Sequence, residues 1–478
     1  MGNSRSTDPI ARRGPRWQTL AQLGSVLLGG ACGESMAPVE REEEQRPNAV
    51  VAALACEASP ANGNVRCTSD QSVLAGSRHG FAAVPAIIGG HGQFVNLVPG
   101  NGNYNASQGT FSFPMRVQNL LAQTMGTPDG STITAVRVFF VGSITNNVAL
   151  DNPDGTGTFT DVGQPFFTYN QAIDRDEAST PRTWVFENIP PANPQFSFGI
   201  LIQAELSDRI IDAQYCAGDV KRRVDVFYPD DESFPPPRPL IVYVHGGAWT
   251  DGDKSDDNEH VLYDPVKDEL LARGYVFAAV NYRLAGGGAN SWPAPVEDVK
   301  CAVRHLRHDA LKYRIDPDRI GAWGHSTGGY LASMLGVLEQ GQFEGNAGYA
   351  TTSSEVQAVV PQAAITDLTE PTELFGFDAE LEAAFPGYSA QASITITASP
   401  VTYADLSDPP FLKLHGDADP TVNQLQSIRL HGLLGGTVNG HDLEIVEGAS
   451  HSFFIPGVGT PPGLAELVAD FFDAQLGN

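Results

Sequence analysis

The stretch Gly324-His325-Ser326-Thr327-Gly328 decides the fold of the second half of the chain. It is preceded by the apolar run Arg319-Ile320-Gly321-Ala322-Trp323 and followed by the helix-favouring run Gly329-Tyr330-Leu331-Ala332-Ser333-Met334-Leu335. We therefore expect a strand, a sharp turn and a helix, with Ser326 at the tip of the turn. Such a turn strains the backbone of the serine, and the glycines two residues before and after it relieve the crowding.

A G-x-S-x-G sequence in this strand–turn–helix context is typical of a nucleophile elbow. The turn lifts the serine hydroxyl clear of the sheet and directs the N-terminus of the following helix at a developing oxyanion. The pentapeptide alone is a weak signal, because glycine and serine are common in turns. A nucleophilic serine also needs a base, an orienting acid and oxyanion donors, which the rest of the sequence has to supply.

The candidate base is His451, on a short loop after the predicted strand 443–446, where an imidazole can reach back over the sheet. A solvated loop histidine is the alternative for this residue taken alone. The candidate acids, Asp417 and Asp419, follow the predicted strand 410–414. We favour Asp419, which lies in the loop proper, because Asp417 is better placed to hold the turn together through its carboxylate.

The oxyanion site is predicted in His245-Gly246-Gly247-Ala248-Trp249, directly after the predicted strand 240–244. Adjacent glycines allow backbone N–H groups to approach a substrate oxygen closely, although a glycine turn after a strand is common on its own. The candidate oxyanion donors are Gly246, Gly247 and Thr327. The candidate substrate-pocket residues, which flank these groups, are His245, Trp249 and His325.

From residue 205 onward, predicted strands alternate with predicted helices. The strands lie at 223–229, 240–244, 275–281, 319–323, 356–364, 410–414 and 443–446, and the helices at 295–313 and 464–476. Continuous apolar strands between amphipathic helices indicate a mostly parallel sheet with both faces covered. The fold class of residues 205–478 is therefore α/β.

Residues 50–204 have a different sequence pattern, in which short β-like runs are separated by turn residues. This spacing predicts an antiparallel β-sandwich, immunoglobulin-like in architecture. No catalytic set is recognisable there, and a fold does not by itself name a function. Contact with a polysaccharide or with a surface is a hypothesis for this domain.

Residues 1–32 have the features of an export signal: several arginines, a single acid, then the short apolar stretch 20–31. Cys32 follows small residues, which resembles a bacterial lipobox, although Gly29 stands where leucine is preferred. Residues 33–49 form an acidic tether. We expect a protein exported from a bacterial cell, either as a membrane-anchored lipoprotein of the periplasm or cell surface or as a secreted protein.

Charge and cysteine usage restrict the partners and the compartment. The 478-residue chain carries a net charge of −27, which argues against nucleic acid and anionic membrane surfaces as partners. Cys56 and Cys67 are disulfide candidates in an oxidising compartment, whereas Cys216 and Cys301 either pair or stay buried as thiols. No metal site or cofactor is expected. His305 and His308 have a metal-compatible spacing but no evident third ligand.

Taken together, these motifs resemble the serial landmarks of the α/β-hydrolase esterases. Further landmarks are Gly252-Asp253-Lys254, Asn281-Tyr282-Arg283-Leu284, Ala398-Ser399-Pro400 and Gly448-Ala449-Ser450-His451. The most similar groups are the hormone-sensitive-lipase-like enzymes and the feruloyl-esterase-like bacterial carboxylesterases. The resemblance covers residues 205–478, and its order of serine, acid and histidine is that of the superfamily. Ala248 and Thr327 depart from the residues usual at their positions, but both retain a backbone donor.

The resemblance implies a serine carboxylesterase that acts on small-molecule esters, with short acyl chains, through an acyl-enzyme and without a cofactor. Ser326 would be the nucleophile, His451 the base and Asp419 the orienting acid. The alternatives are a carbohydrate esterase that removes acetyl or feruloyl groups, a peptidase on the same fold, and a non-catalytic surface-binding protein. Residues 367–393, between two predicted strands, are a candidate cap over the site.

Overall fold

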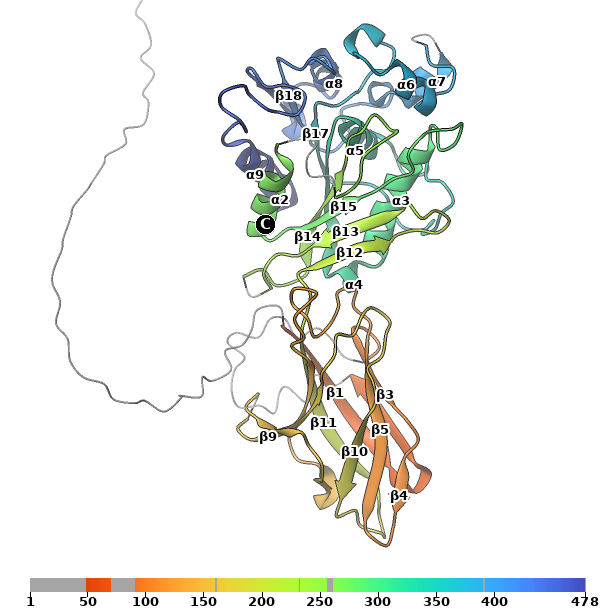
Figure 1. Cartoon of the computed structure of the whole chain (residues 1–478), viewed down its shortest axis with the longest axis vertical. Helices are drawn as coiled ribbons and strands as arrows, with labels where there is room; N and C mark the ends of the chain where they lie inside the picture. Colours follow the sequence, from red (N-terminus) through yellow and green to blue (C-terminus); the bar gives the residue numbers. More distant parts are fainter. Residues whose placement is uncertain are drawn as a thin grey trace, which may run out of the picture. The chain divides into compact units, whose positions relative to one another are not determined.

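The computed structural model of the chain describes residues 49–69, 91–159, 161–231, 233–255, 261–389 and 392–477 (Figure 1). Every described residue belongs to one compact unit. The predicted export signal, Cys32 and nearly all of the acidic tether lie outside the described residues. Among the helices that are described, none is long and apolar enough to cross a membrane.

Residues 49–205 form two antiparallel sheets. The first has the order β2-β1-β11-β6-β9-β8 and the second β3-β5-β10-β7, with β4 paired to β5. The strands are β1 (Ala49–Ser59), β2 (Asn64–Ser69), β3 (Val95–Pro99), β4 (Asn103–Asn105), β5 (Thr110–Asn119), β6 (Val136–Val141), β7 (Ala149–Leu150), β8 (Gly155–Gly157), β9 (Gln164–Tyr169), β10 (Arg182–Glu187) and β11 (Phe196–Glu205). Two short 3₁₀ helices, η1 (Pro60–Asn62) and η2 (Thr145–Asn147), lie between them.

The two sheets share one core. In β5, buried and less buried residues alternate along the strand, as a sheet with one face inward requires. Aromatic rings fill the centre of this core, where Trp184 stacks on Phe167 with ring centroids 5.0 Å apart. A disulfide joins Cys56 to Cys67 across the β1–β2 pair. The immunoglobulin-like topology of this sandwich stays a prediction.

The C-terminal half contains an eight-stranded sheet of order β12-β13-β15-β14-β16-β17-β18-β19. Its strands are β12 (Arg209–Gln214), β13 (Arg223–Phe227), β14 (Arg238–Val244), β15 (Val276–Val280), β16 (Ile315–His325), β17 (Ala358–Gln362), β18 (Leu412–Gly416) and β19 (Asp442–Val446). The pairings of β12 with β13 and of β13 with β15 are antiparallel, and all the others are parallel. The sheet is therefore mostly parallel, as the sequence predicts.

Helices cover both faces of this sheet (Figure 1). They are α2 (Tyr263–Ala272), α3 (Ala294–His308), α4 (Ala310–Tyr313), α5 (Thr327–Val337), α6 (Asp378–Ala384), α7 (Ser393–Ala398), α8 (Leu425–Leu433) and α9 (Leu464–Leu476), with 3₁₀ turns η3 (Pro371–Glu373), η4 (Pro400–Thr402) and η5 (Val438–Gly440). One core contains α2 and α9, and the other contains α3, α5 and α8. The α/β architecture over this half is confirmed.

Helix α3 shows how the sequence builds one of these layers. Its apolar residues Val296, Val299, Val303 and Leu306 recur at helical spacing and are all buried against the sheet. The sequence predicts one helix over 295–313, whereas the structure interrupts it at Asp309 and begins α4 at the next residue. A second disulfide, from Cys216 to Cys301, joins the segment after β12 to the middle of α3.

Candidate active site

Ser326 occupies the sharp turn between β16 and α5. Its φ of 55° and ψ of −119° are unfavourable for a residue with a side chain, and its N–H donates to the Gln362 carbonyl at 2.9 Å. A Cβ atom on Gly328 would lie 1.9 Å from the Val244 carbonyl oxygen, and one on Gly324 would lie 2.3 Å from that of Gly328. Both glycines of the motif are therefore required by close backbone contacts.

The side chains of Ser326, His451 and Asp419 form one hydrogen-bonded chain. His451 Nε2 lies 2.9 Å from Ser326 Oγ, and His451 Nδ1 lies 2.7 Å from Asp419 Oδ2. The three residues follow β16, β18 and β19, whose carboxyl ends lie at the same edge of the parallel sheet. The serine hydroxyl can thus donate to Nε2 while Nδ1–H donates to the carboxylate, which is the arrangement that proton transfer from the serine requires.

The Asp419 carboxylate is buried and heavily hydrogen-bonded. The second oxygen, Oδ1, accepts from the backbone N–H groups of Thr421 and Val422 at 2.8 and 3.0 Å. Burial alone would raise the pKa of Asp419, but hydrogen bonds from His415, His451 and the backbone lower it well below its usual value. The carboxylate therefore remains ionised at neutral pH.

His415 is a contact of this acid to which the sequence analysis assigns no role. Its Nε2 lies 3.3 Å from Asp419 Oδ2 and donates to the Val422 carbonyl at 2.9 Å, while Nδ1 lies 2.7 Å from Ser427 Oγ. The ring is completely buried. It fixes the loop that holds the carboxylate, and its place at the end of a strand, four residues before Asp419, is the signal that could have suggested this.

Asp417, the other candidate acid, makes a different contact. Its Oδ1 accepts from the backbone N–H of Gly448 at 2.6 Å, which ties the loop after β18 to the loop that carries His451. Asp419 therefore contacts the imidazole of His451, whereas Asp417 bridges two loops.

The glycine loop after β14 is folded tightly beside the serine. Gly247 has a φ of 105°, and a Cβ atom there would lie 2.1 Å from the Asp251 carbonyl oxygen. The Gly247 carbonyl accepts from the N–H groups of Thr250 and Asp251, and that of Gly246 accepts from the Tyr282 hydroxyl at 3.1 Å. These contacts fix the direction of each peptide in the loop. The donor roles of Gly246, Gly247 and Thr327 toward an oxyanion stay predictions.

Two predicted pocket residues, His245 and Trp249, lie in the interior. The His245 ring stacks on Tyr282, with centroids 4.4 Å apart, and Trp249 packs edge-on against Tyr330 and Phe385. Both side chains are only 1% exposed. Their ring contacts support the glycine loop from the interior of the domain. Trp249 also connects this loop to Phe385 of the candidate cap segment. A direct contact of either side chain with substrate stays a prediction.

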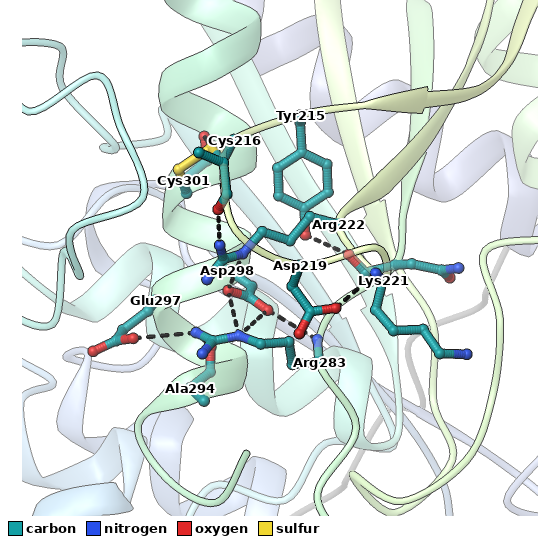
Figure 2. Close-up of polar contacts among 12 residues, drawn as sticks. Tyr215, Cys216, Asp219, Lys221, Arg222, Arg283, Ala294, Glu297, Asp298 and Cys301 are labelled. Atoms are coloured by element: carbon teal, nitrogen blue, oxygen red, sulfur yellow. Dashed lines mark hydrogen bonds and ion pairs between the residues drawn. A yellow bond between two sulfur atoms is a disulfide. The ribbon is translucent and has the colours of Figure 1, made fainter. Parts of the chain in front are cut away.

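A buried ion-pair network holds the neighbouring loop that carries Tyr282 (Figure 2). Asp298 on α3 accepts from Arg283 Nε and from Arg222 Nε, each at 2.8 Å. The Asp298 side chain is 1% exposed, and the disulfide between Cys216 and Cys301 lies beside it (Figure 2). These buried ion pairs tie the loop that carries Tyr282 and Arg283 to α3. They therefore hold Tyr282 in place, where its hydroxyl supports the glycine loop.

The third predicted pocket residue, His325, contacts the catalytic histidine candidate. It precedes Ser326, is 3% exposed, and donates from Nε2 to the backbone carbonyl of His451 at 2.8 Å. The two rings also lie close together, with centroids 4.9 Å apart. His325 therefore holds the loop of His451 in register with the serine.

We expect the change His325→Phe to lower kcat for an ester substrate about 10- to 100-fold, because a small displacement of the base is costly in rate. KM should change little, since the hydrogen bond orients the base and does not bind substrate. His325→Gln, which retains an N–H donor, should recover part of the loss. Steady-state kinetics of the two variants measure this, and an unchanged kcat in His325→Phe would refute the positioning role.

In the described parts of the chain, no group of three or more His, Cys, Asp or Glu side chains could hold a metal ion. His305, one of the two helical histidines with metal-compatible spacing, has Nε2 2.9 Å from the Tyr313 hydroxyl and Nδ1 2.9 Å from that of Tyr349.

Comparison with known proteins shows that this half of the chain is similar to ester hydrolases. The BD-FAE family model matches residues 224–434. Esterase LipQ of Mycobacterium tuberculosis is 28% identical over 274 residues, which are 56% of this chain and 62% of that protein. The probable carboxylic ester hydrolase LipM of the same organism is 29% identical over 204 residues, which are 42% of this chain and 45% of that protein. This chain thus spans only about half of the length of these curated relatives.

Among solved structures, a truncated form of a carbohydrate esterase from gut microbiota is 27% identical, with a TM-score of 0.47, over 56% of this chain and 96% of that one. The family match and the sequence relatives thus show that the C-terminal half of this chain is similar to serine esterases of the α/β-hydrolase type. Its mostly parallel sheet has the architecture that this similarity implies.

Proposed function

We propose that this protein hydrolyses carboxylic esters with short acyl chains through an acyl-enzyme formed on Ser326. One observation carries the proposal: the hydrogen-bonded chain from Ser326 Oγ through both ring nitrogens of His451 to Asp419. The named relatives, which are esterases, support ester hydrolysis as the reaction class.

In the proposed mechanism, Ser326 Oγ attacks the ester carbonyl while His451 Nε2 takes its proton. The negative charge that forms on the carbonyl oxygen is held by the backbone N–H groups of Gly246, Gly247 and Thr327. Each such donor contributes on the order of 3 kcal/mol to the stability of the transition state. The tetrahedral intermediate then collapses, the C–O bond to the alcohol breaks, and His451 gives its proton to the leaving oxygen.

Deacylation repeats these steps with water as the nucleophile. His451 removes a proton from the water, the hydroxide attacks the acyl carbonyl, and the proton returns to Ser326 Oγ as the acid leaves. The ionised Asp419 keeps the proton of the neutral imidazole on Nδ1 and stabilises the cation that forms at each transfer. The lowered pKa of this carboxyl, which several hydrogen bonds maintain against the effect of burial, supports that role.

The proposed activity is tested with p-nitrophenyl esters from acetyl to dodecanoyl and the purified protein. We expect kcat/KM to be highest for acetyl to butyryl esters and to fall steeply toward dodecanoyl. Failure to release p-nitrophenol from any ester above the uncatalysed rate would contradict ester hydrolysis. A maximum at the long chains would contradict only the short acyl preference.

The same proposal extends to location and to the N-terminal half. We propose export from a bacterial cell, with a lipid on Cys32 as the means of membrane attachment; two disulfides in the folded chain support an oxidising compartment. We propose that the sandwich has an immunoglobulin-like topology and attaches the protein to a polysaccharide or to the cell surface. None of the groups assigned to the reaction lies in it.

A further inference from the structure

Three buried nitrogen atoms near one edge of the eight-stranded sheet have no hydrogen-bond acceptor among the described residues. They are Lys413 Nζ on β18, His441 Nε2 directly before β19, and His431 Nδ1 in the last turn of α8. Within the described part of the chain, none of the three has a hydrogen-bond partner. Lys413 is 0% exposed and His441 2%. Burial of an unpaired polar atom costs free energy, and burial of an unpaired charge costs more.

The neighbouring residues show that the side chains of Lys413 and His441 share one location, and His431 is close enough to act electrostatically on His441. Leu412 and Leu414 belong to the core on the α9 side, so Lys413, which alternates with them, faces the opposite side with Phe411. Lys413 Nζ lies 5.8 Å from the centre of the Phe411 ring, and the His441 ring lies 6.1 Å from the same centre. Both groups thus flank one aromatic ring beneath α8.

The neighbouring hydrogen bonds also define whether each of these nitrogens is a donor or an acceptor. The backbone N–H of Phe411 donates to His441 Nδ1 at 3.2 Å, so this nitrogen is the acceptor of the neutral ring and the proton lies on Nε2. His441 Nε2–H is therefore a donor, and the Lys413 ammonium has donors only. His431 Nδ1 can become a third donor by its choice of tautomer. A site with this composition matches an anion and not a cation.

The local charges also favour an anion at this site. Burial lowers the pKa of Lys413 to about 7 and that of His441 to about 4, and Lys413 depresses the pKa of both histidines further. The opposing group is Asp442, which acts on Lys413 and His431 from an exposed position and forms no ion pair with the lysine in the described structure. Below pH about 7 the protonated lysine therefore destabilises the fold, and this cost declines as the pH rises toward its ordinary pKa.

We propose that Lys413, His431 and His441 bind a small inorganic anion, a halide or an oxyanion of the phosphate type. The anion accepts hydrogen bonds from the three nitrogens and supplies the missing countercharge beneath α8. It links β18, α8 and the start of β19, and β18 leads directly into the loop of Asp419. The site is separate from the groups assigned to ester hydrolysis, so it does not depend on the proposed function.

The experiment is thermal unfolding of the purified protein at pH 7 in sodium chloride, sodium phosphate and sodium gluconate at equal ionic strength. Gluconate, the bulkiest of the three anions, is the reference. We expect the Tm of the wild type to be higher in chloride, in phosphate or in both, by about 2 °C or more. The increase should shrink at pH 9, where Lys413 loses its proton.

Two variants separate a specific site from a general salt effect. Lys413→Met removes the ammonium and retains the length of the side chain, so its Tm should be the same in all three salts, whatever its level. Lys312→Met, at a half-exposed lysine of α4, should retain the difference seen in the wild type. An increase only with chloride assigns the site to a halide, and one only with phosphate assigns it to an oxyanion. Equal Tm values of the wild type in all three salts, or an undiminished increase in Lys413→Met, would overturn the proposal.

Discussion

Ser326→Ala is expected to lower kcat for p-nitrophenyl acetate by about 10⁶-fold, because removal of the nucleophile leaves only the weak catalysis of the remaining site. Among the described residues, the hydroxyl forms a hydrogen bond only with His451, at 2.9 Å, so its removal should change the stability of the fold little. Release of p-nitrophenol together with thermal unfolding of the same preparation measures both effects.

Ser333 provides a matched control on the same helix. It is a buried serine of α5 whose hydroxyl donates to the Gly329 carbonyl at 2.8 Å and does not reach His451. Ser333→Ala removes one hydroxyl from the same helix and should retain kcat within a few-fold. If Ser326→Ala kept a substantial part of the activity, or if both variants lost it equally, the nucleophile would be wrongly assigned.

Asp419→Asn is expected to lower kcat by about 10⁴-fold while the fold is retained. An amide is close in size to the carboxylate, but it is neutral and cannot stabilise the imidazolium that forms as Ser326 loses its proton. It also favours the wrong tautomer of His451, since its N–H₂ group can donate to Nδ1. Kinetics at saturating substrate measure the loss, with KM expected to change much less than kcat.

Asp417→Asn is the control two residues away. Its carboxylate accepts one backbone hydrogen bond, from Gly448, which an amide oxygen can also accept. We expect less than about a tenfold loss of kcat, in proportion to a small shift of the His451 loop. A larger loss in Asp417→Asn than in Asp419→Asn would reverse the assignment of the acid.

Much of the catalytic fold could be predicted because its signals are local. The apolar strands of the parallel sheet are buried on both faces, and α9 begins and ends at the predicted residues. The elbow could be recognised because its glycines are imposed by contacts within the turn and with the adjacent strand. By contrast, β12 is mostly exposed and shows no regular alternation, so periodicity does not reveal it.

The contacts that the sequence analysis did not predict join distant segments of the chain. His325 reaches a carbonyl 126 positions further along the chain, and nothing near it in the sequence indicates that partner. The pairing of Cys216 with Cys301 is separated by 85 positions and needs the sheet order to bring α3 beside β12. Similarly, the sequence analysis gives Asp417 a role in its own turn, whereas its carboxylate reaches Gly448, 31 positions further along the chain.

The measurement that tests the central claim most directly is covalent labelling with an organophosphate ester, followed by intact-mass analysis and peptide mapping. Such a reagent phosphorylates a serine only where an adjacent base activates it. Our account predicts one adduct per chain, located on Ser326 and absent from Ser326→Ala. A protein that stays unlabelled while it hydrolyses esters, or an adduct on another residue that persists in Ser326→Ala, would contradict the claim that Ser326 is the nucleophile.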